Sequence, residues 1–406
     1  MKYLLFSPLI LLASTVFGTT PHAFVTNEFG GEVSVINVSN DTVQKIIGFT
    51  NPKVVKVAFD GTLAYVGSSD GTLRVIDTIT NTLLPVTVHI APPISLALTP
   101  DAKYIYILCS NNTVTVIKTS DYSIHAHISG FHHPRDIKIL PDGSFAYVTN
   151  SGNGTVSIID ISNNTIVGTI AGFKTPIGLT FTMDGTYGYI TDTNHNSVYV
   201  VRVSDNTIIQ TLLGFDQPSY VAVTPDKSTA FVSNTGNDTI SIVRTSDNLT
   251  IGSIPIPTPK SLSVTQDGLY LYVGSDFGTV FKVRILDRTL LIGLPDFQNP
   301  SNIGLTTTNS PADSVNGCQV MISPTNVYNQ ITWNNGPGIP VSFTVYRDAY
   351  LMEMIVTLPA GTRHYIDLDL EPGQTYSYYV TANYANGFSS TIGSSTVTPV
   401  RVCTAP

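Results

Sequence analysis

The chain has 406 residues and a formal net charge of −8, and its charged share of 12% is about half that of an average soluble domain. This acidic balance lacks the basic face that binding to nucleic acid requires, so we exclude nucleic acid as a partner. Hydrophobic residues make up 42% of the sequence, enough for a large core, and the abundant Thr, Ser, Asn and Gly favour strands and tight turns.

The first eighteen residues have the pattern of a secretory signal. Lys2 supplies a positive charge, Leu4 to Leu12 form a short apolar run, and Val16-Phe17-Gly18 is typical of a cleavage site. The apolar run is too short to cross a bilayer, and we find no longer one downstream. The sequence therefore predicts a signal peptide at 1–18, no membrane span, and an exported protein that is periplasmic or extracellular.

A five-residue motif of the type Ala-Tyr-Val-Thr-Asn recurs seven times over about the next 290 residues. Successive copies are 41 or 42 residues apart, and such a constant period marks stacked supersecondary units. The copies begin at Ala23, Ala64, Ile105, Ala146, Gly188, Ala230 and Leu271.

Each repeat reads as four short antiparallel strands joined by turns. A Pro opens the first strand, as at Pro218, an Asp-Gly type turn follows, and two alternating strands with Asn-rich turns complete the unit. Four-stranded sheets repeated around an axis are the blades of a β-propeller. The sequence predicts an all-β, seven-bladed propeller over residues 21–308.

The phase of the repeat predicts how the ring closes. The first repeat begins at its second strand, and the missing first strand appears after the seventh copy, near Ser301–Thr307. We expect this late strand to complete the blade begun at Ala23, because an open ring would leave two unpaired strand edges.

These seven motifs resemble the YVTN family of seven-bladed propellers, a group of secreted or cell-surface bacterial and archaeal proteins. The resemblance covers about residues 21–308 and implies the fold. It does not imply one function, because members of the family serve varied roles.

After a linker at 309–317, residues 318–403 lose the repeat and read as a separate all-β unit. The stretch Leu370 to Tyr376 resembles the turn and tyrosine corner of fibronectin type III domains, and Trp333 is expected in the core of this sandwich. Cys318 and Cys403 bracket the unit, and we predict a disulfide between them, which export permits. Cys109 ends an apolar strand and is expected to be a buried thiol.

Comparison of the seven repeats with one another distinguishes residues that recur, which favours a packing role, from residues that vary, which favours a role in binding. A Gly-Phe pair ahead of the first strand recurs in most repeats, which favours packing between blades over a carbohydrate platform. The variable residues lie in the loops that enter the first strand and follow the second, which we expect to meet at one face around the central channel. We expect this rim to be the ligand-binding surface.

Basic and polar side chains on this rim are the candidate ligand-binding residues. Lys53, Arg135 and Lys260 share the position directly after the Pro, with Lys56 and Lys138 further along two strands, so they suit a small anion if they converge. The alternative is solvated charge that Asp136 partly neutralises. The remaining candidates are His132, His133, Lys174, Asp216 and His195.

No catalytic motif, dinucleotide fingerprint or haem-attachment sequence is present, and we predict no cofactor. His125 and His127 could share a strand face for a metal, but surface histidines on an outer strand are favoured and no metal site is predicted. The leading hypothesis is a monomeric, non-enzymatic binding or scaffold protein for a protein, glycan or small anion. The alternative is a propeller hydrolase or lyase, of lactonase type, that uses His195 and Glu28 at the channel mouth. A redox accessory protein is a third possibility, which a visible absorbance spectrum tests.

Overall fold

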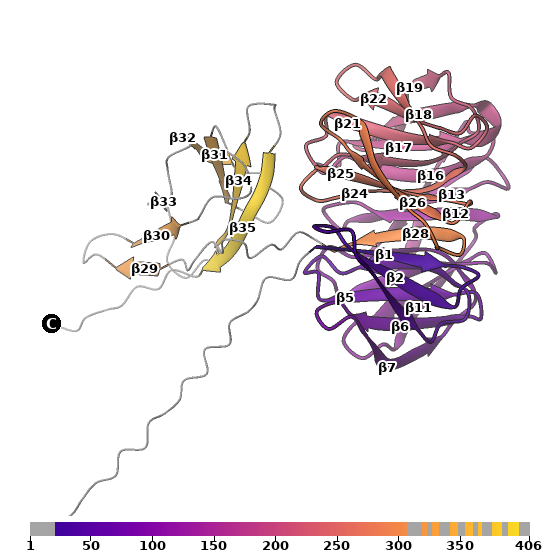
Figure 1. Ribbon diagram of the computed structural model, residues 1–406, viewed down its shortest axis with the longest axis horizontal. Coiled ribbons are helices and arrows are strands. Elements are labelled where there is room, and N and C mark those ends of the chain that lie inside the picture. Colours follow the sequence, from indigo (N-terminus) through magenta and orange to yellow (C-terminus); the bar gives the residue numbers. More distant parts are fainter. Residues whose placement is uncertain are drawn as a thin grey trace, which may run out of the picture.

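The computed structural model describes residues 21–306 and seven strands between residues 319 and 397. Residues 21–306 form seven four-stranded antiparallel sheets. Each innermost strand contacts the innermost strands of the sheets on either side, and these contacts run once around a closed ring (Figure 1). The predicted seven-bladed propeller is confirmed.

We number the blades in chain order, blade 1 being β28-β1-β2-β3 and blade 7 being β24-β25-β26-β27. The innermost strands are β28 (Pro300–Leu305), β4 (Pro52–Val57), β8 (Pro93–Leu98), β12 (Pro134–Ile139), β16 (Pro176–Phe181), β20 (Pro218–Val223) and β24 (Pro259–Val264). The second strands are β1 (His22–Asn27), β5 (Leu63–Ser68), β9 (Tyr104–Cys109), β13 (Phe145–Asn150), β17 (Tyr187–Asp192), β21 (Thr229–Asn234) and β25 (Tyr270–Ser275).

The outer half of each blade holds the two remaining strands. The third strands are β2 (Glu32–Asn37), β6 (Thr72–Asp77), β10 (Thr113–Lys118), β14 (Thr155–Asp160), β18 (Ser197–Arg202), β22 (Thr239–Arg244) and β26 (Thr279–Arg284). The outermost strands are β3 (Val43–Ile47), β7 (Thr82–His89), β11 (Ile124–Ser129), β15 (Thr165–Ala171), β19 (Thr207–Leu213), β23 (Leu249–Pro255) and β27 (Thr289–Leu294). One short 3-10 helix, η1 (Thr193–His195), follows β17.

The innermost strands begin with Pro because their first residue needs no ladder donor. A shift in register follows the Pro: in blade 4, Pro134 is opposite Asn150, but the next pair is Ile137 with Val148. A bulge of this kind turns side chains out of the regular alternation. Arg135, directly after this Pro, is not paired in the ladder, and its side chain is exposed.

The ring closes as the repeat phase predicted. β28 pairs with β1 in antiparallel register, with Ala23 opposite Leu305 and Asn27 opposite Pro300. In Figure 1 the orange β28 lies beside the indigo β1, although they are far apart in sequence. The ends of the ring also meet, since His22 N donates to Thr306 Oγ1 over 2.7 Å. We call the face that holds these ends the terminal face, and the opposite one the loop face.

Apolar side chains fill the wedges between blades. The aromatic residue of each second strand is at most 2% exposed, in Phe24, Tyr65, Tyr106, Tyr147, Tyr189, Phe231 and Tyr272. The phenylalanines ahead of the innermost strands are 4–8% exposed, in Phe49, Phe131, Phe173, Phe215 and Phe297. Phe49, for example, packs with β1 and β2 residues of blade 1 and with β4 and β5 residues of blade 2. The predicted packing role of this phenylalanine is confirmed.

Cys109 is fully buried as a free thiol, as expected. Burial raises the pKa of its thiol, which keeps the sulfur protonated and unreactive at neutral pH. The predicted partners of the disulfide, Cys318 and Cys403, lie outside the described residues, as do Trp333, the linker and the signal peptide.

The C-terminal strands form two antiparallel sheets. The first has the order β29 (Gln319–Ile322), β30 (Val327–Thr332) and β33 (His364–Asp367). The second has the order β32 (Met354–Pro359), β31 (Ser342–Arg347), β34 (Tyr376–Asn383) and β35 (Ser389–Val397). The prediction of a second all-β unit agrees with these strands.

Candidate functional site

The two kinds of variable loop meet on the loop face, as expected. In blade 4 the loop after β13 donates to the loop that enters β12, from Ser151 N to His133 O over 3.1 Å and from Gly152 N to His132 O over 3.0 Å. In blade 1 the corresponding bond joins Glu28 N to Asn299 O over 3.2 Å. These bonds fix the rim of the channel as a ring of paired loops.

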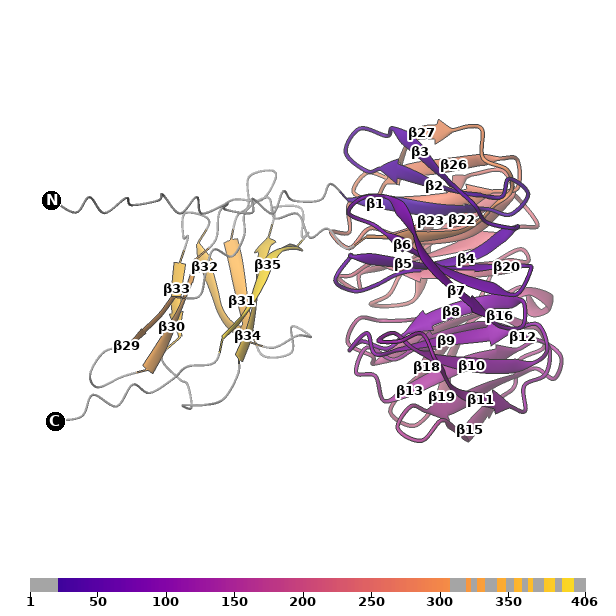
Figure 2. The same ribbon diagram turned by 90° about the horizontal axis from the view of Figure 1, so that it is seen from below.

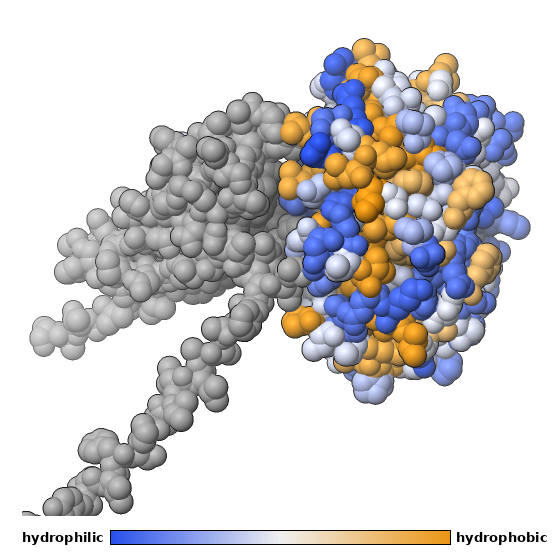
Figure 3. Space-filling view, viewed as in Figure 1, coloured by the Kyte–Doolittle hydropathy of each residue, from blue (hydrophilic) through white to orange (hydrophobic). Residues whose placement is uncertain are grey.

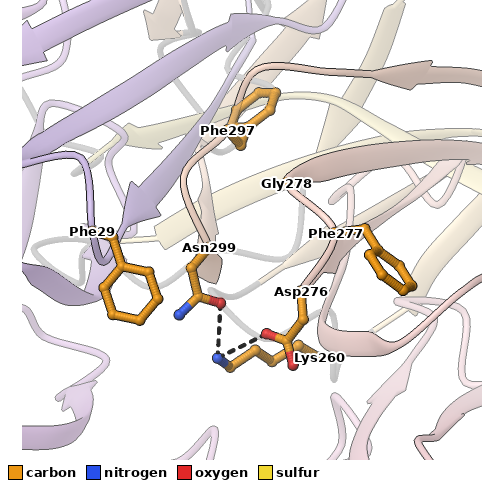
Figure 4. A pocket seen from close by; sticks show the side chains of 7 residues that line it. All are labelled: Phe29, Lys260, Asp276, Phe277, Gly278, Phe297 and Asn299. Carbon is orange, nitrogen blue, oxygen red and sulfur yellow. Dashed lines mark hydrogen bonds and ion pairs between the residues drawn. The ribbon is translucent and has the colours of Figure 1, made fainter.

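A hollow of about 570 Å³ opens where the loop faces of blades 7 and 1 meet (Figure 4). We call it the cleft. Its walls come from segments far apart in sequence, which only ring closure brings together. The lining residues are Phe29, Lys260, Asp276, Phe277, Gly278, Phe297 and Asn299.

The polar side of the cleft is centred on the ammonium group of Lys260. This residue occupies the bulge after Pro259, which turns its side chain toward the rim. Its Nζ lies 3.0 Å from Asp276 Oδ1 and donates to Asn299 Oδ1 over 3.1 Å, and Glu28 Oε2 is 3.9 Å away. Asn299 Nδ2 in turn donates to Glu28 Oε2 over 3.0 Å. The network is therefore pre-organised, with one cation between two carboxylates.

Two exposed phenylalanines border this network. Phe29 is 72% exposed and Phe277 71%, whereas Phe297, at the back of the cleft, is 5% exposed. Phe29 follows β1 and Phe277 follows β25, at a turn where the other blades carry Gly, Asn, Asp or His. Neither side chain is needed for packing, so the repeat does not account for them.

The other predicted rim cations are not assembled with Lys260. Arg135 is exposed on blade 4, and its Nε donates to Ser151 Oγ over 3.2 Å. Lys53 lies on blade 2, and its ammonium has no hydrogen-bond or ion-pair partner among the described residues. Asp136, which the alternative interpretation gave as neutralising part of this charge, binds Lys138 Nζ at 2.7 Å.

The remaining rim candidates contribute mainly through their backbones. His132 and His133 are exposed, and their carbonyl groups accept the loop bonds of blade 4. The exposed Lys174 donates its backbone N–H to Asp192 over 2.6 Å, and the carbonyl of Asp216 accepts from Gly236 N over 3.1 Å. All four therefore lie on the loop face, but among the described residues no hydrogen bond or ion pair links them to the cleft.

His195 forms a small polar cluster of its own on blade 5. Its Nδ1 lies 3.2 Å from the fully buried carboxylate of Asp192 and 2.9 Å from the Tyr199 hydroxyl. Asp192 also caps η1 and accepts backbone N–H groups, including that of Thr175 over 2.9 Å. Glu28, its proposed catalytic partner, is separated from His195 by two blades, and no hydrogen bond or ion pair joins them.

Tyr220 lines the channel beneath the rim. Burial, followed by the negative charge of Asp136, raises the pKa of its hydroxyl to about 12. The negative charges of Asp276 and Glu28 also raise this pKa, whereas the positive charge of Arg135 lowers it. At neutral pH Tyr220 is therefore an uncharged hydrogen-bond donor inside the channel.

Sequence reasoning missed the two phenylalanines, although a signal was present. Phe29 and Phe277 break the polar turn of the repeat in two copies only, and these copies become neighbours through the predicted ring closure. Asn299 and Asp276 lie in the two kinds of variable loop that the repeats identify, but the network with Lys260 depends on distances between loops that spacing does not give.

Within the described part of the chain, no group of three or more His, Cys, Asp or Glu residues is placed to hold a metal ion. His125 and His127 lie on the outermost strand β11, as expected. His125 stacks near Tyr104 with ring centres 4.9 Å apart, and His127 Nδ1 contacts Thr115 Oγ1 at 3.2 Å. No helix among the described residues is long and apolar enough to span a membrane.

No family model and no curated protein matches the chain. Among solved structures the chain is similar to the hydrazine synthase of Kuenenia stuttgartiensis, with 18% identity and a TM-score of 0.59 over 64% of this chain and 91% of the other. It is also similar to a functionally unknown protein from Desulfotomaculum acetoxidans, with 15% identity and a TM-score of 0.63 over 70% of this chain and 99% of the other. At these identities the likeness shows the shared fold alone.

Proposed function

We propose that this protein is an exported, non-enzymatic binding protein that presents the cleft on its loop face to a protein or glycan partner. The observation that carries the proposal is the pair of exposed phenylalanines, Phe29 and Phe277, on either side of the Lys260 network. Aromatic anchors beside oriented polar groups are the usual composition of a binding site.

Among residues 21–306, most of the other exposed large apolar side chains lie on outermost strands or in turns. Several are scattered over the outermost strands, among them Ile47 on β3 at 76% exposure and Leu213 on β19 at 74%. Figure 3 shows hydrophobic residues interspersed with hydrophilic ones over one side of the propeller. Single exposed apolar side chains are normal in soluble proteins, whereas two exposed aromatic side chains that line the same hollow are typical of a binding surface.

The position of the chain ends agrees with a binding role. Both ends of the ring lie on the terminal face, so a protein held through either end would direct the cleft outward. The propeller repeats also support membership of the YVTN group. A fibronectin type III-like sandwich at 318–403 remains part of the proposal, supported by one three-stranded and one four-stranded sheet.

The test compares the full chain with a Phe29→Ala, Phe277→Ala double variant on a glycan array and in a pull-down. Removing two anchors from the centre of an interface is expected to weaken binding by about 2 kcal/mol or more, roughly thirtyfold. An Ile79→Ala, Leu286→Ala variant is the control, because these apolar side chains, 61% and 52% exposed, lie in turns between third and fourth strands on the terminal face. Equal binding by both variants would reject the cleft as the site.

A hydrolase or lyase of lactonase type is the second candidate, and the His195–Asp192 pair favours it. A buried carboxylate beside Nδ1 orients the ring and leaves Nε2 free to accept a proton. The test is a panel of lactone, glycan and lyase substrates with His195→Ala, and with His133→Ala as a control on the same face. Turnover that only His195→Ala abolishes, without a change in melting temperature, would establish the enzyme and reject the non-enzymatic proposal.

A further inference from the structure

The channel holds a second charged region, nearer the terminal face. The innermost strands run from the loop face to the terminal face, so their fourth residue after the Pro lies well below the rim. Five of the seven residues at this position have small side chains and two are lysines. They are Gly304, Lys56, Ala97, Lys138, Thr180, Ala222 and Ser263.

One of the two lysines is neutralised within its own strand. Lys138 Nζ lies 2.7 Å and 2.9 Å from the two carboxylate oxygens of Asp136. Asp136 is 7% exposed and accepts further bonds from Ser95 Oγ and from the backbone N–H of Ile137 and Leu179. This carboxylate has little remaining capacity for another cation.

Lys56 is the unpaired cation of this region. Among the described residues, its Nζ has no hydrogen-bond or ion-pair partner, and it lies 5.8 Å from the centre of the Phe59 ring. Burial is the main cause that lowers the pKa of Lys56 to about 8, and the positive charge of Lys138 lowers it further. The negative charge of Asp136 has the opposite effect and raises this pKa. Lys56 on β4 and Lys138 on β12 are at equivalent positions of blades with one blade between them, and the charge of Lys138 contributes to the lowered pKa of Lys56.

No other charge on the neighbouring strands compensates Lys56. β28 and β8, which flank β4 in the ring, carry no ionisable side chain. β5 contributes only Tyr65, and β1, which also contacts β4, contributes only His22. The two lysines and Asp136 therefore leave one uncompensated positive charge in a confined space, which is unfavourable without a counter-ion.

We propose that the channel binds a small oxyanion between Lys56 and Lys138, at a site separate from the cleft. The ammonium groups supply charge-assisted hydrogen bonds to the anion. Thr180 and Ser263 carry hydroxyl groups at the same level of the strands. The site deepens the proposed binding role, but it depends on neither phenylalanine.

The experiment titrates the purified full chain with phosphate, sulfate and acetate by calorimetry at pH 7, with sodium chloride at matched ionic strength as the reference. We expect saturable binding of at least one oxyanion, and a higher melting temperature in its presence. Lys56→Met and Lys138→Met, which keep side-chain length, are each expected to weaken binding at least tenfold. Lys45→Met, on the outermost strand β3, is expected to leave binding unchanged.

A second measurement identifies the group that carries the charge. Near pH 8 the free protein holds Lys56 partly deprotonated, so anion binding is expected to take up protons, measured as a heat that varies with the ionisation enthalpy of the buffer. Lys56→Met is expected to abolish this uptake. Absence of saturable binding by all three oxyanions, or equal affinity in Lys56→Met and wild type, overturns the proposal. The Phe29→Ala, Phe277→Ala variant should bind the anion normally, so failure of the cleft and failure of this site are distinguishable.

Discussion

Single residues connect neighbouring blades through one repeated hydrogen bond. In blades 3, 4 and 5 the second-strand tyrosine donates its hydroxyl to an Asn in the outer turn of the next blade. This Asn adopts positive φ, near 58°, so it serves both the turn and the bond. The pairs are Tyr106 with Asn164, Tyr147 with Asn206 at 2.6 Å, and Tyr189 with Asn248 at 2.9 Å.

Blade 1 lacks this bond, which leads to a prediction. Phe24 occupies the tyrosine position, and the equivalent acceptor, Asn81 Oδ1, is buried without a partner. Phe24→Tyr is expected to raise the free energy of unfolding by about 1 kcal/mol, because it satisfies a buried acceptor. The measurement is denaturant unfolding at equilibrium.

The reverse change is the control for this prediction. Tyr189→Phe removes the donor to Asn248 Oδ1 and is expected to lower the free energy of unfolding by about 1 kcal/mol. The variant leaves Asn248 Oδ1 without this donor, as Asn81 Oδ1 is without a partner in the wild-type protein. A Phe24→Tyr variant less stable than wild type would contradict the assignment of Asn81 as the missing partner.

At the scale of elements, the closure between blades 7 and 1 has a buried ion pair. Lys282 on β26 is 5% exposed in its side chain, and its Nζ lies 2.6 Å from Asp41 Oδ1 and 2.7 Å from Val38 O. The same Nζ lies 4.4 Å from the centre of the Tyr270 ring. Figure 2 shows β26 and β27 beside β2 and β3, so this contact spans the closure.

Lys282→Met is expected to lower the free energy of unfolding by about 2 kcal/mol. Removing one partner of a buried pair costs about 3–5 kcal/mol, and the partial exposure of Asp41 allows water to offset part of this. Arg284→Met is the matched control on the same strand, because its pair with Asp287 is exposed and solvent screens the interaction, so its loss should change stability little. The measurement is denaturant unfolding. Equal changes in the free energy of unfolding in the two variants would show that the buried pair between blades 7 and 1 stabilises the protein no more than an exposed pair does.

At the scale of the whole molecule, one late strand completes the ring. β28 supplies the innermost strand of blade 1 and contacts β24 and β4 on either side. Without it, β1 would expose an unpaired edge to the channel, and exposed edges promote association. Stability of the propeller is therefore shared around the ring and depends on its closure.

A chain that ends at Asn299 is expected to lose this closure, whereas a chain that ends at Thr306 retains it. The shorter chain should unfold at lower temperature and over a broader range, because seven blades are no longer one cooperative unit. Calorimetry and size-exclusion chromatography measure the two effects. If both chains melt alike and remain monomeric to the same degree, β28 is dispensable.

Much of the fold could be predicted from the sequence, because repetition makes the pattern of one blade visible seven times. The period, the Pro before each innermost strand and the phase of the copies were sufficient to predict the blades and the pairing of β28 with β1. The packing role of Phe49 and its equivalents also followed from recurrence. All of these are local or periodic features, which spacing along the chain encodes directly.

The candidate sites were decided by the tertiary structure. Lys53, Arg135 and Lys260 share one repeat position, yet only Lys260 meets two carboxylates, because loops from blades 7 and 1 converge there. Likewise Lys56 and Lys138 resemble each other in sequence, but Asp136 neutralises only Lys138. Charge interactions depend on distances of a few ångströms across the ring, and the sequence by itself specifies which residues are equivalent but not which ones meet.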